Sequence, residues 1–252
     1  MLKTKRLDLI EEYIVERGSV SLDELVEKFN VSKNTIRRDV NDLVEGGEFK
    51  KVYGGVSVNK STYSVPNVDR QIRNHRQKQQ IAKVASEFVQ NGDIIFIDSG
   101  STTVEMVEFI KNKELTIITN NVDFIIKALP YNNLSIFSTG GMLERTKNSF
   151  TRAENNELIT SYNITKAFLA STGVTIKNGV TNSLPLESGL KSTVVQESAE
   201  NFLLVDSSKF DKVALTTYCQ LNEINHLISD SIPDKYIRYA KENNIEVVVT
   251  EK

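Results

Sequence analysis

The chain has 252 residues, 39% of them hydrophobic, and a formal net charge of −2 at pH 7. This length predicts about two domains and excludes a chain too short to bury a core. With one cysteine, Cys219, there is no internal disulfide, and without a leader or a long apolar run we expect a cytoplasmic protein with no membrane partner. His75 and His226 adjoin no cysteine or second histidine, so no metal site is expected.

Residues 6–29 predict two short helices. The first covers Arg6 to Arg17 and stops at Gly18, a residue suited to the left-handed position that ends a helix. The second has the spacing of a capping box, with Ser21 as N-cap and Glu24 three residues on. Apolar residues recur at helical spacing in both, as Leu7, Ile10 and Ile14 and then as Leu22, Leu25, Val26 and Phe29.

A third helix is predicted to start after Ser32, whose hydroxyl suits an N-cap. Its apolar face is formed by Ile36, Val40, Leu43 and Val44. The opposite face is polar and basic in its first two turns, where a recognition helix meets base edges and phosphates. We expect this face to contact DNA through Ser32, Lys33, Asn34, Thr35, Arg37, Arg38 and Asn41.

After Gly46-Gly47, two strands around Gly54-Gly55 are predicted, which would form a wing. Residues 28–60 carry a net charge of +3, whereas residues 1–27 carry −3, so the cations gather in the half that would meet phosphate. Residues 1–58 therefore predict a winged helix-turn-helix domain; the alternative is a solvated basic helix face. Ser21, Lys51, Tyr53 and Gly54 complete the candidate DNA contacts.

Residues 59–77 are rich in polar residues and then in arginine, which predicts a linker. Helical spacing begins at Gln79 and ends near Asn91-Gly92. From there to the C-terminus short apolar runs alternate with helical stretches, so residues 78–252 predict an α/β domain with a mostly parallel sheet covered on both faces. The predicted strands are 94–97, 115–118, 134–137, 167–170, 202–205 and 247–249, and helices include 104–110, 122–129 and 234–243.

Ligands of such sheets bind beyond the carboxyl ends of the strands, and polar clusters fall there. The stretch Asp98–Thr103 directly follows a strand and opens a predicted helix, an arrangement suited to binding an anion such as phosphate. Its hydroxyls could equally serve only as helix caps. The spacing of a nucleotide-binding P-loop is absent. Candidate effector-binding residues are Asp98, Ser99, Gly100, Ser101, Thr102, Thr103, Thr119, Asn120, Gly140 and Gly141.

The chain resembles the DeoR family of bacterial transcriptional regulators in several motifs. The resemblance rests on Val31–Val40 and Lys51–Val56 in the first domain, and on Asp98–Thr103 and Asp206–Phe210 in the second. It implies a repressor whose C-terminal domain, related to sugar-phosphate isomerase folds, binds a phosphorylated sugar or related metabolite and needs no other cofactor. The same resemblance adds the effector-binding candidates Lys78, Thr172, Gly173, Glu187, Lys191 and Lys209.

Within the family, Tyr162–Phe168 and Leu215–Cys219 resemble the repressors of inositol catabolism, which implies a phosphorylated keto acid as inducer. The chain departs from the common family pattern at Ser149–Arg152, where Arg152 could supply a further contact to phosphate or carboxylate.

Two other functions are open to such a chain. Asp98, Glu187 and Lys191 could move protons in an isomerase-like enzyme, but a helix-turn-helix has no role there and no histidine adjoins the site, so we expect no catalysis. The second is a transcriptional activator with the same sensor domain, which the sequence does not distinguish from a repressor. The expected partners are operator DNA, the effector and a second copy of the chain in a dimer or tetramer, since two-fold operators imply at least a dimer.

Overall fold

The computed structural model describes residues 3–45, 49–58, 74–152 and 157–250. The chain divides into two compact units, Met1–Arg73 and Asn74–Lys252. The expected turn at Gly46-Gly47 and residues 59–73 of the expected linker lie outside the described residues. The last three residues of that expected linker, 75–77, are helical, because α5 already begins at His75.

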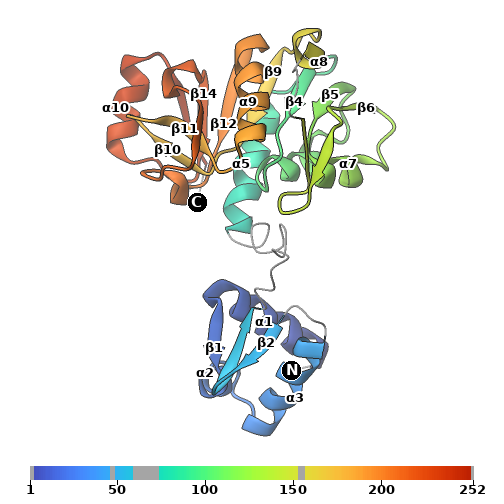
Figure 1. Ribbon diagram of the computed structural model, residues 1–252, viewed down its shortest axis with the longest axis vertical. Coiled ribbons are helices and arrows are strands. Elements are labelled where there is room, and N and C mark those ends of the chain that lie inside the picture. Colours follow the sequence, from blue (N-terminus) through green and yellow to red (C-terminus); the bar gives the residue numbers. More distant parts are fainter. Residues whose placement is uncertain (1–2, 46–48, 59–73, 153–156, 251–252) are drawn as a thin grey trace. The chain divides into compact units, whose positions relative to one another are not determined.

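In the part of the N-terminal unit that the structure describes, there are three helices and a small antiparallel sheet (Figure 1). The helices are α1 (Lys3–Arg17), α2 (Leu22–Phe29) and α3 (Lys33–Glu45), which confirms the three predicted helices. The sheet has the order β1-β3-β2, with β1 at Ser19–Ser21, β2 at Phe49–Val52 and β3 at Gly55–Val58. Strand β1 was not predicted, since three residues are too few to show a period. Its pairing with β3 attaches the wing to the start of α2.

Local capping sets the helix boundaries in this unit. Gly18 has a φ of 73°, and its N–H donates to the Ile14 carbonyl over 2.8 Å, so α1 ends as predicted. The Ser21 hydroxyl accepts from Glu24 N over 3.1 Å, which confirms this N-cap of α2. The second half of the predicted capping box is not formed among the described residues: the Glu24 carboxylate accepts from Tyr13 and Arg17, each over 2.9 Å.

The C-terminal unit is built on a seven-stranded sheet of order β15-β14-β12-β9-β4-β5-β6, in which every pairing is parallel. Its strands are β4 (Ile94–Ile97), β5 (Leu115–Thr119), β6 (Leu134–Ser138), β9 (Lys166–Leu169), β12 (Glu200–Leu204), β14 (His226–Ser229) and β15 (Glu246–Val249). All six predicted strands are present, and β14 is additional. It was missed because its polar ends break the apolar run that marks a buried strand.

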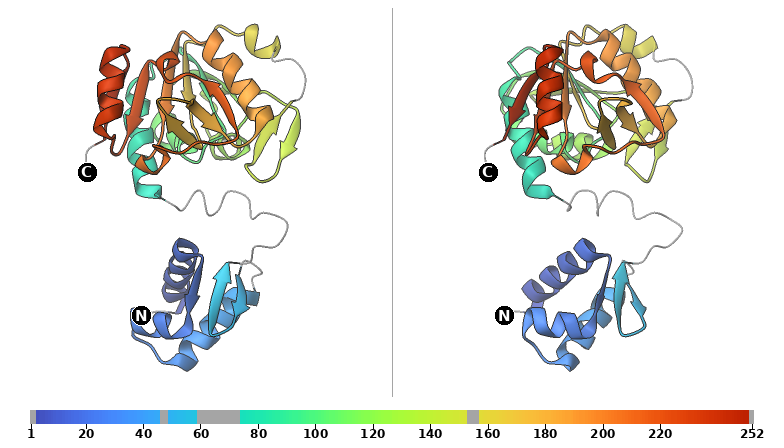
Figure 2. Two further views of the ribbon diagram at one scale, coloured as in Figure 1. Left: turned by 60° about the vertical axis from the view of Figure 1, so that its left-hand side comes forward. Right: turned by 90° about the vertical axis from the view of Figure 1, so that its left-hand side faces the viewer.

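Helices cover both faces of this sheet (Figures 1 and 2). Along β4, Ile95 and Ile97 pack with one hydrophobic cluster and Phe96 with the other, as expected for alternating side chains of a strand buried on both faces. The first cluster includes residues of α5 (His75–Glu87), α6 (Val107–Ile110) and α7 (Val122–Ala128). The second includes residues of α9 (Pro185–Glu197) and α10 (Asp234–Glu242). The predicted doubly covered α/β architecture is confirmed.

Smaller elements lie around the sheet. A hairpin of β7 (Met142–Glu144) and β8 (Ser149–Thr151) follows β6, and α8 (Glu157–Thr160) precedes β9. A three-stranded antiparallel sheet contains β10 (Gly173–Thr175), β11 (Gly179–Asn182) and β13 (Thr216–Cys219). The described residues also form short 3-10 turns, among them η1 (Thr103–Met106), η2 (Ser207–Lys209) and η3 (Leu221–Glu223). Across the described ranges, no helix is long and apolar enough to cross a membrane.

Candidate functional site

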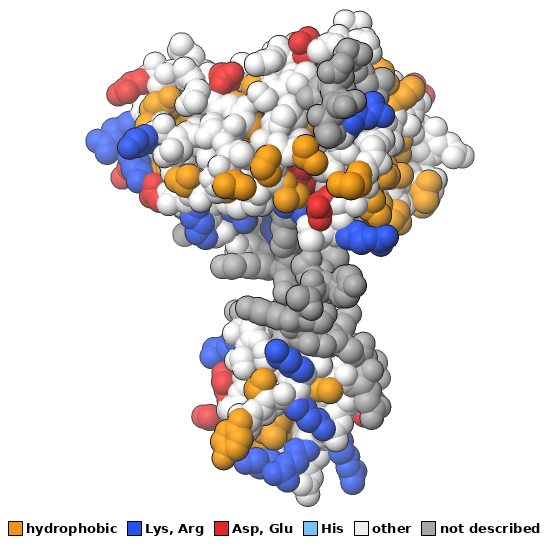
Figure 3. Space-filling model, in the orientation of Figure 1, with side chains coloured by type: hydrophobic (Ala, Val, Ile, Leu, Met, Phe, Trp, Pro, Cys, Tyr) orange, Lys and Arg blue, Asp and Glu red, His pale blue; other side chains and the backbone are white. Residues whose placement is uncertain are grey.

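The predicted recognition helix α3 presents its polar face to solvent. Ile36 and Val40 are buried against the core of the N-terminal unit, which fixes the orientation of the helix. Ser32 caps α3 by accepting from Thr35 N over 3.2 Å, as predicted. Lys33 forms an ion pair with Asp23 of α2. The residues that remain exposed on this face are Ser32, Lys33, Asn34, Arg37, Arg38 and Asn41, with Thr35 half-buried. Figure 3 shows Lys and Arg side chains gathered over the described part of this unit.

The wing presents a second exposed surface. Lys51 is exposed, and the Tyr53 side chain at the turn between β2 and β3 is fully exposed. Gly54 has a φ of 75°, which this tight turn requires. Ser21 differs from these candidates, because its hydroxyl already serves as the N-cap of α2.

Asp39 occupies a buried position on the inner side of α3. Its carboxylate accepts from Arg6 of α1, with Nε to Oδ2 at 2.7 Å and Nη2 to Oδ1 at 3.2 Å, and only 1% of the residue is exposed. A two-bond contact between a guanidinium and a carboxylate fixes orientation as well as distance. Asp39 therefore ties α3 to α1.

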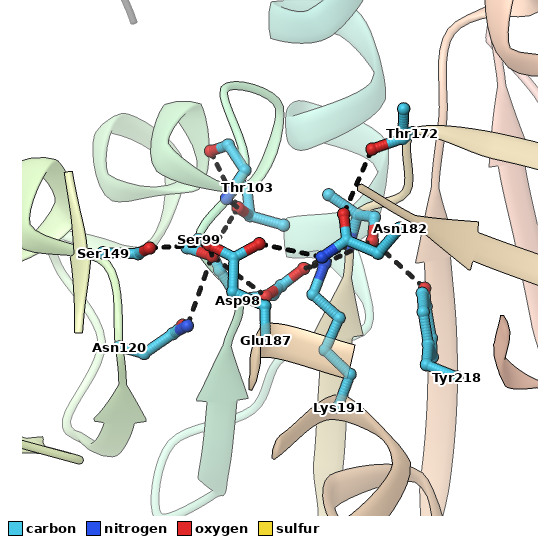
Figure 4. A network of polar contacts seen from close by, with 12 residues as sticks. Asp98, Ser99, Thr103, Asn120, Ser149, Thr172, Asn182, Glu187, Lys191 and Tyr218 are labelled. Atoms are coloured by element: carbon cyan, nitrogen blue, oxygen red, sulfur yellow. Dashed lines mark hydrogen bonds and ion pairs between the residues drawn. The ribbon is translucent and has the colours of Figure 1, made fainter. Parts of the chain in front are cut away.

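In the C-terminal unit, Asp98 and Lys191 form a buried ion pair at the carboxyl end of β4 (Figure 4). Lys191 Nζ lies 2.7 Å from Asp98 Oδ2, and the side chains are 3% and 0% exposed. The backbone of Ala170, just after β9, bonds to both members of this ion pair. Its N–H donates to Asp98 over 2.9 Å, and its carbonyl accepts from Lys191 over 2.9 Å. The Tyr218 hydroxyl donates to the same carbonyl over 3.1 Å. Burial raises the pKa of Tyr218 well above its ordinary value, which keeps this hydroxyl protonated.

Glu187 of α9 is the centre of an adjoining network. Its Oε1 accepts from Ser149 over 2.6 Å and from Ser99 over 3.2 Å. Its Oε2 accepts from Lys147 over 2.9 Å and from Asn182 over 2.8 Å. A carboxylate offers about four lone-pair positions, so four donors saturate it. Glu187 thus joins the end of β4, the β7–β8 hairpin and β11 to α9.

The charge of Glu187 is strongly stabilised. Burial raises its pKa, but Lys191, Lys147 and the hydrogen bonds from Ser149 and Lys147 outweigh burial and bring the pKa to about 2. The carboxylate is therefore ionised at neutral pH. With Lys147 and Lys191 opposite Glu187 and Asp98, the four side chains are balanced in charge.

The loop after Asp98 is held by internal hydrogen bonds. The Thr103 hydroxyl donates to the Asp98 carbonyl over 2.6 Å and accepts from Gly100 N over 3.1 Å. The backbone N–H groups of Ser101 and Thr102 have no backbone acceptor among the described residues; Ser101 is partly exposed and Thr102 is buried. The loop opens the 3-10 turn η1, and the α-helix predicted there starts only at Val107. The helix predicted over 104–110 is therefore confirmed in position, but its first turn is a 3-10 turn, in which Glu105 N donates to the Thr102 carbonyl over 3.2 Å.

The neighbouring strand ends contribute further polar groups. The Thr119 hydroxyl donates to the Ile97 carbonyl over 2.6 Å, which joins β5 to β4. Asn120 donates to Ser99 Oγ over 3.2 Å, while its Oδ1 is buried without a partner in the described part of the chain. Thr172 donates to Asn182 Oδ1 over 3.1 Å, so it reaches Glu187 through one side chain.

The glycines among the predicted site residues lie where a larger side chain would collide with its neighbours or where φ is positive. A Cβ at Gly100 would lie 2.4 Å from the Ala170 Cβ, and one at Gly141 would lie 2.3 Å from the Thr151 carbonyl oxygen. At Gly173 a Cβ would meet the backbone of residue 212 at 2.2 Å, and Gly140 has a φ of 63°. The exposed Arg152 adjoins Gly140, since its Nη2 is 3.9 Å from the position of a Cβ there.

Lys78 and Lys209 come from other elements of the same domain. Lys78 is buried on α5, with 4% of the residue exposed. Lys209 ends η2 beyond strand β12, and its Nζ is 4.0 Å from Asp206 Oδ2. The structure therefore brings Asp98, Ser99, Asn120, Thr172, Glu187 and Lys191 into one network, with Lys209 at a neighbouring strand end.

Four members of the network were not among the predicted site residues: Lys147, Ser149, Asn182 and Tyr218. Lys147 carries no signal in the sequence, because it lies in a short hairpin connection among exposed residues. Asn182 ends β11, five residues before Glu187, and its contact with Thr172 depends on the pairing of β10 with β11.

An exposed polar recognition helix with a wing, joined to an α/β domain with a polar site at its strand ends, defines a DNA-binding transcriptional regulator with a sensor domain. Two family models match the chain: the DeoR-like helix-turn-helix domain over residues 6–62 and the DeoR C terminal sensor domain over residues 73–231. The chain belongs to the DeoR family, as the sequence motifs implied.

Curated relatives extend over nearly the whole chain. It is 40% identical to the HTH-type transcriptional regulator IolR of Bacillus subtilis, over 98% of this chain and 99% of that protein. It is 33% identical to the lactose phosphotransferase system repressor of Staphylococcus epidermidis, over 92% of this chain and 93% of that protein. These relatives are named as regulators or repressors rather than enzymes, in agreement with the expected class.

Among solved structures, ribose 5-phosphate isomerase A from Methanocaldococcus jannaschii is similar over 54% of this chain and 55% of its own. The TM-score is 0.41 and the identity 18%. A likeness at this level carries no argument about ligand or activity.

Proposed function

We propose that this DNA-binding regulator represses a catabolic operon for a carbohydrate or polyol, and that a phosphorylated intermediate of the pathway releases it from its operator. The effector is a phosphorylated sugar or keto acid, and an intermediate of myo-inositol breakdown is the first candidate. No other cofactor is required. The observation that carries the proposal is the polar site at the carboxyl ends of β4, β5 and β9, where parallel sheets bind ligands.

The charge distribution of the site supports an anionic group at its margin. The inner carboxylates are each matched by a lysine, Asp98 by Lys191 and Glu187 by Lys147. A phosphate is therefore not drawn between these pairs. The backbone N–H groups of Ser101 and Thr102 offer donors that suit phosphate oxygens at the edge of the network.

The inositol branch is supported by sequence resemblance. Tyr162–Phe168 and Leu215–Cys219 resemble inositol-catabolism repressors of the family. The similarity to the Bacillus subtilis regulator IolR covers both domains, so it is consistent with a shared effector class. Repression rather than activation is favoured because several relatives are named repressors.

The first experiment is a thermal-shift screen of the full chain against phosphorylated sugars and phosphorylated inositol-pathway intermediates. A ligand that binds the native state raises the melting temperature. The same compound is then added to the protein on an operator fragment selected from random-sequence DNA, and we expect it to lower operator affinity by about 5- to 150-fold, the usual range of allosteric coupling. A compound that binds without altering operator affinity would contradict the proposed switch.

Two variants matched in shape but different in charge test where the anion binds. Ser101 is partly exposed, and no hydrogen bond of its hydroxyl is recorded among the described residues. Ser101→Asp places a negative charge beside these N–H groups and is expected to weaken effector binding about tenfold or more. Asparagine has nearly the shape of aspartate but no charge, so Ser101→Asn is expected to weaken binding less. Equal effects of the two substitutions would exclude an anion at this loop.

The proposed function also implies a quaternary structure and a cellular location for the protein. A two-fold operator requires two recognition helices, so we propose a dimer or tetramer acting in the cytoplasm. Sedimentation equilibrium of the free protein and of the operator complex gives the stoichiometry. A single copy bound to a complete operator would contradict it.

A further inference from the structure

Asn74 is the first residue of the C-terminal unit and has an unusual conformation. Its φ and ψ are 56° and 33°, in the left-handed region, and it directly precedes α5. An asparagine at a helix start normally caps the helix with its side chain, but Asn74 makes no such bond. Its Nδ2 instead donates to Oδ1 of Asp206 over 3.1 Å. The side chain therefore joins the start of α5 to a distant part of the chain.

Asp206 lies at the carboxyl end of β12, on the edge of the sheet where the effector site is formed. It is 2% exposed, and its Oδ1 also accepts from Ser208 N over 3.0 Å. Lys209 Nζ lies 4.0 Å from its Oδ2. Burial raises the pKa of Asp206, but the bonds from Ser208 and Asn74 and the charge of Lys209 outweigh burial and lower it. The carboxylate is thus ionised and holds Asn74 by a charge-assisted bond.

A second contact ties the first turns of α5 to the loop after β4. Gln79 donates to Glu105 Oε2 over 3.5 Å, and Glu105 belongs to η1, which follows the Asp98–Thr103 loop. Lys127 of α7 holds the other oxygen of Glu105 over 3.0 Å. The beginning of α5 is therefore connected to two strand ends of the effector edge, through Asp206 at β12 and through Glu105 beyond β4.

The chain enters the sensor domain at this point, because residues before Asn74 lead to the DNA-binding unit. An asparagine in the left-handed region is strained relative to glycine, so the conformation depends on contacts that hold it. The only bond recorded for its side chain among the described residues is the one to Asp206. A ligand that changes the surroundings of Lys209 or Asp206 would alter this contact directly.

We propose that Asn74 and Asp206 are positioning residues that couple the effector site to operator binding. In the ligand-free protein their hydrogen bond holds the start of α5 in the arrangement that favours the operator, and the ligand acts in part by weakening this bond. The inference rests on the proposed function, in which an effector at the strand ends controls DNA affinity. Neither residue is required to contact DNA.

The substitution Asn74→Gly isolates the side chain, because glycine adopts the left-handed conformation without strain. Asn244→Gly is the matched control: Asn244 also has a positive φ, 57°, and lies between α10 and β15. The full-length variants are titrated, without effector, against a fragment selected by the wild-type protein and against unrelated DNA of equal length. We expect Asn74→Gly to lower specific affinity about tenfold and to leave non-specific affinity unchanged. Asn244→Gly is expected to match the wild type on both.

A second variant and a second readout separate coupling from stability. Asn74→Asp sets two carboxylates against each other and is expected to lower specific affinity further. Hydrogen exchange of Lys78 N–H, which donates to the Asn74 carbonyl over 3.0 Å, should be faster in both Asn74 variants while the central strands keep their protection. Specific affinities of both variants within twofold of the wild type would overturn the inference.

The measurements distinguish an error in the coupling role of Asn74 from an error in the proposed function. If the wild-type protein selects no DNA sequence, or no phosphorylated compound releases it, the proposed function is wrong. If the wild type behaves as proposed and both Asn74 variants are identical to it, only the coupling role is wrong.

Discussion

The substitution Glu187→Gln tests the physical account of the effector site. Glutamine keeps the shape of the side chain but removes the charge that Lys147 and Lys191 stabilise. The side chain is 1% exposed, and four donors surround its carboxylate. Losing the charge of a buried, paired group is destabilising because its partners stay buried without compensation.

The size of the effect follows from the pKa of Glu187. In the folded protein it is about 2, against an ordinary value of 4.5. A tenfold change in an acid constant corresponds to about 1.4 kcal/mol, so this difference stabilises the folded sensor domain by about 3 kcal/mol at pH 7. Because the folded pKa is depressed, the stabilisation is complete above about pH 5 and is lost as the pH falls toward 2. At pH 3 less than half should remain.

Urea unfolding followed by circular dichroism at several pH values between 7 and 3 measures this contribution. The unfolding curves are fitted with two transitions, because the chain has two compact units that can unfold separately. The control is Glu197→Gln, an exposed position on the same helix α9, which should change stability by no more than about 0.5 kcal/mol. A difference below about 1 kcal/mol between wild type and Glu187→Gln at pH 7, or one that does not shrink on acidification, would refute the reasoning.

Three further predictions concern other parts of the chain. Ser32→Ala should destabilise the N-terminal unit by about 1 kcal/mol in thermal unfolding, and Ser32→Gly by only a few tenths, because the hydroxyl caps α3; equal losses would speak against the cap. Arg37→Ala should weaken DNA binding and reduce the salt dependence by about one counterion, and an unchanged salt slope would remove Arg37 from the phosphate contacts. Gly100→Ala should cost about 1–3 kcal/mol, since its Cβ would lie 2.4 Å from that of Ala170, whereas Gly189→Ala meets nothing within 4 Å and should be neutral or stabilising in urea unfolding.

Much of the N-terminal unit could be predicted locally. Gly18 at the end of α1 and the N-caps Ser21 and Ser32 act within four residues of their own positions, so the sequence shows them directly. The exposed and buried faces of α3 follow from a period of 3.6 residues. What local pattern could not reveal is β1, which exists only because β3 pairs with it. The partner of Asp39 is likewise distant, 33 residues away at Arg6.

In the sensor domain, the sequence by itself determined the alternation of strands and helices and the polar character of the strand ends. Continuous apolar runs are visible without knowing their neighbours, because a strand buried on both faces needs them. Only the tertiary structure decided which polar groups meet. Lys147 and Glu187 are 40 residues apart, and Asp98 and Lys191 come from a strand end and a helix that share no local pattern. Their ion pairs depend on chain crossings that bring distant charges within 3 Å, where burial makes each partner indispensable to the other.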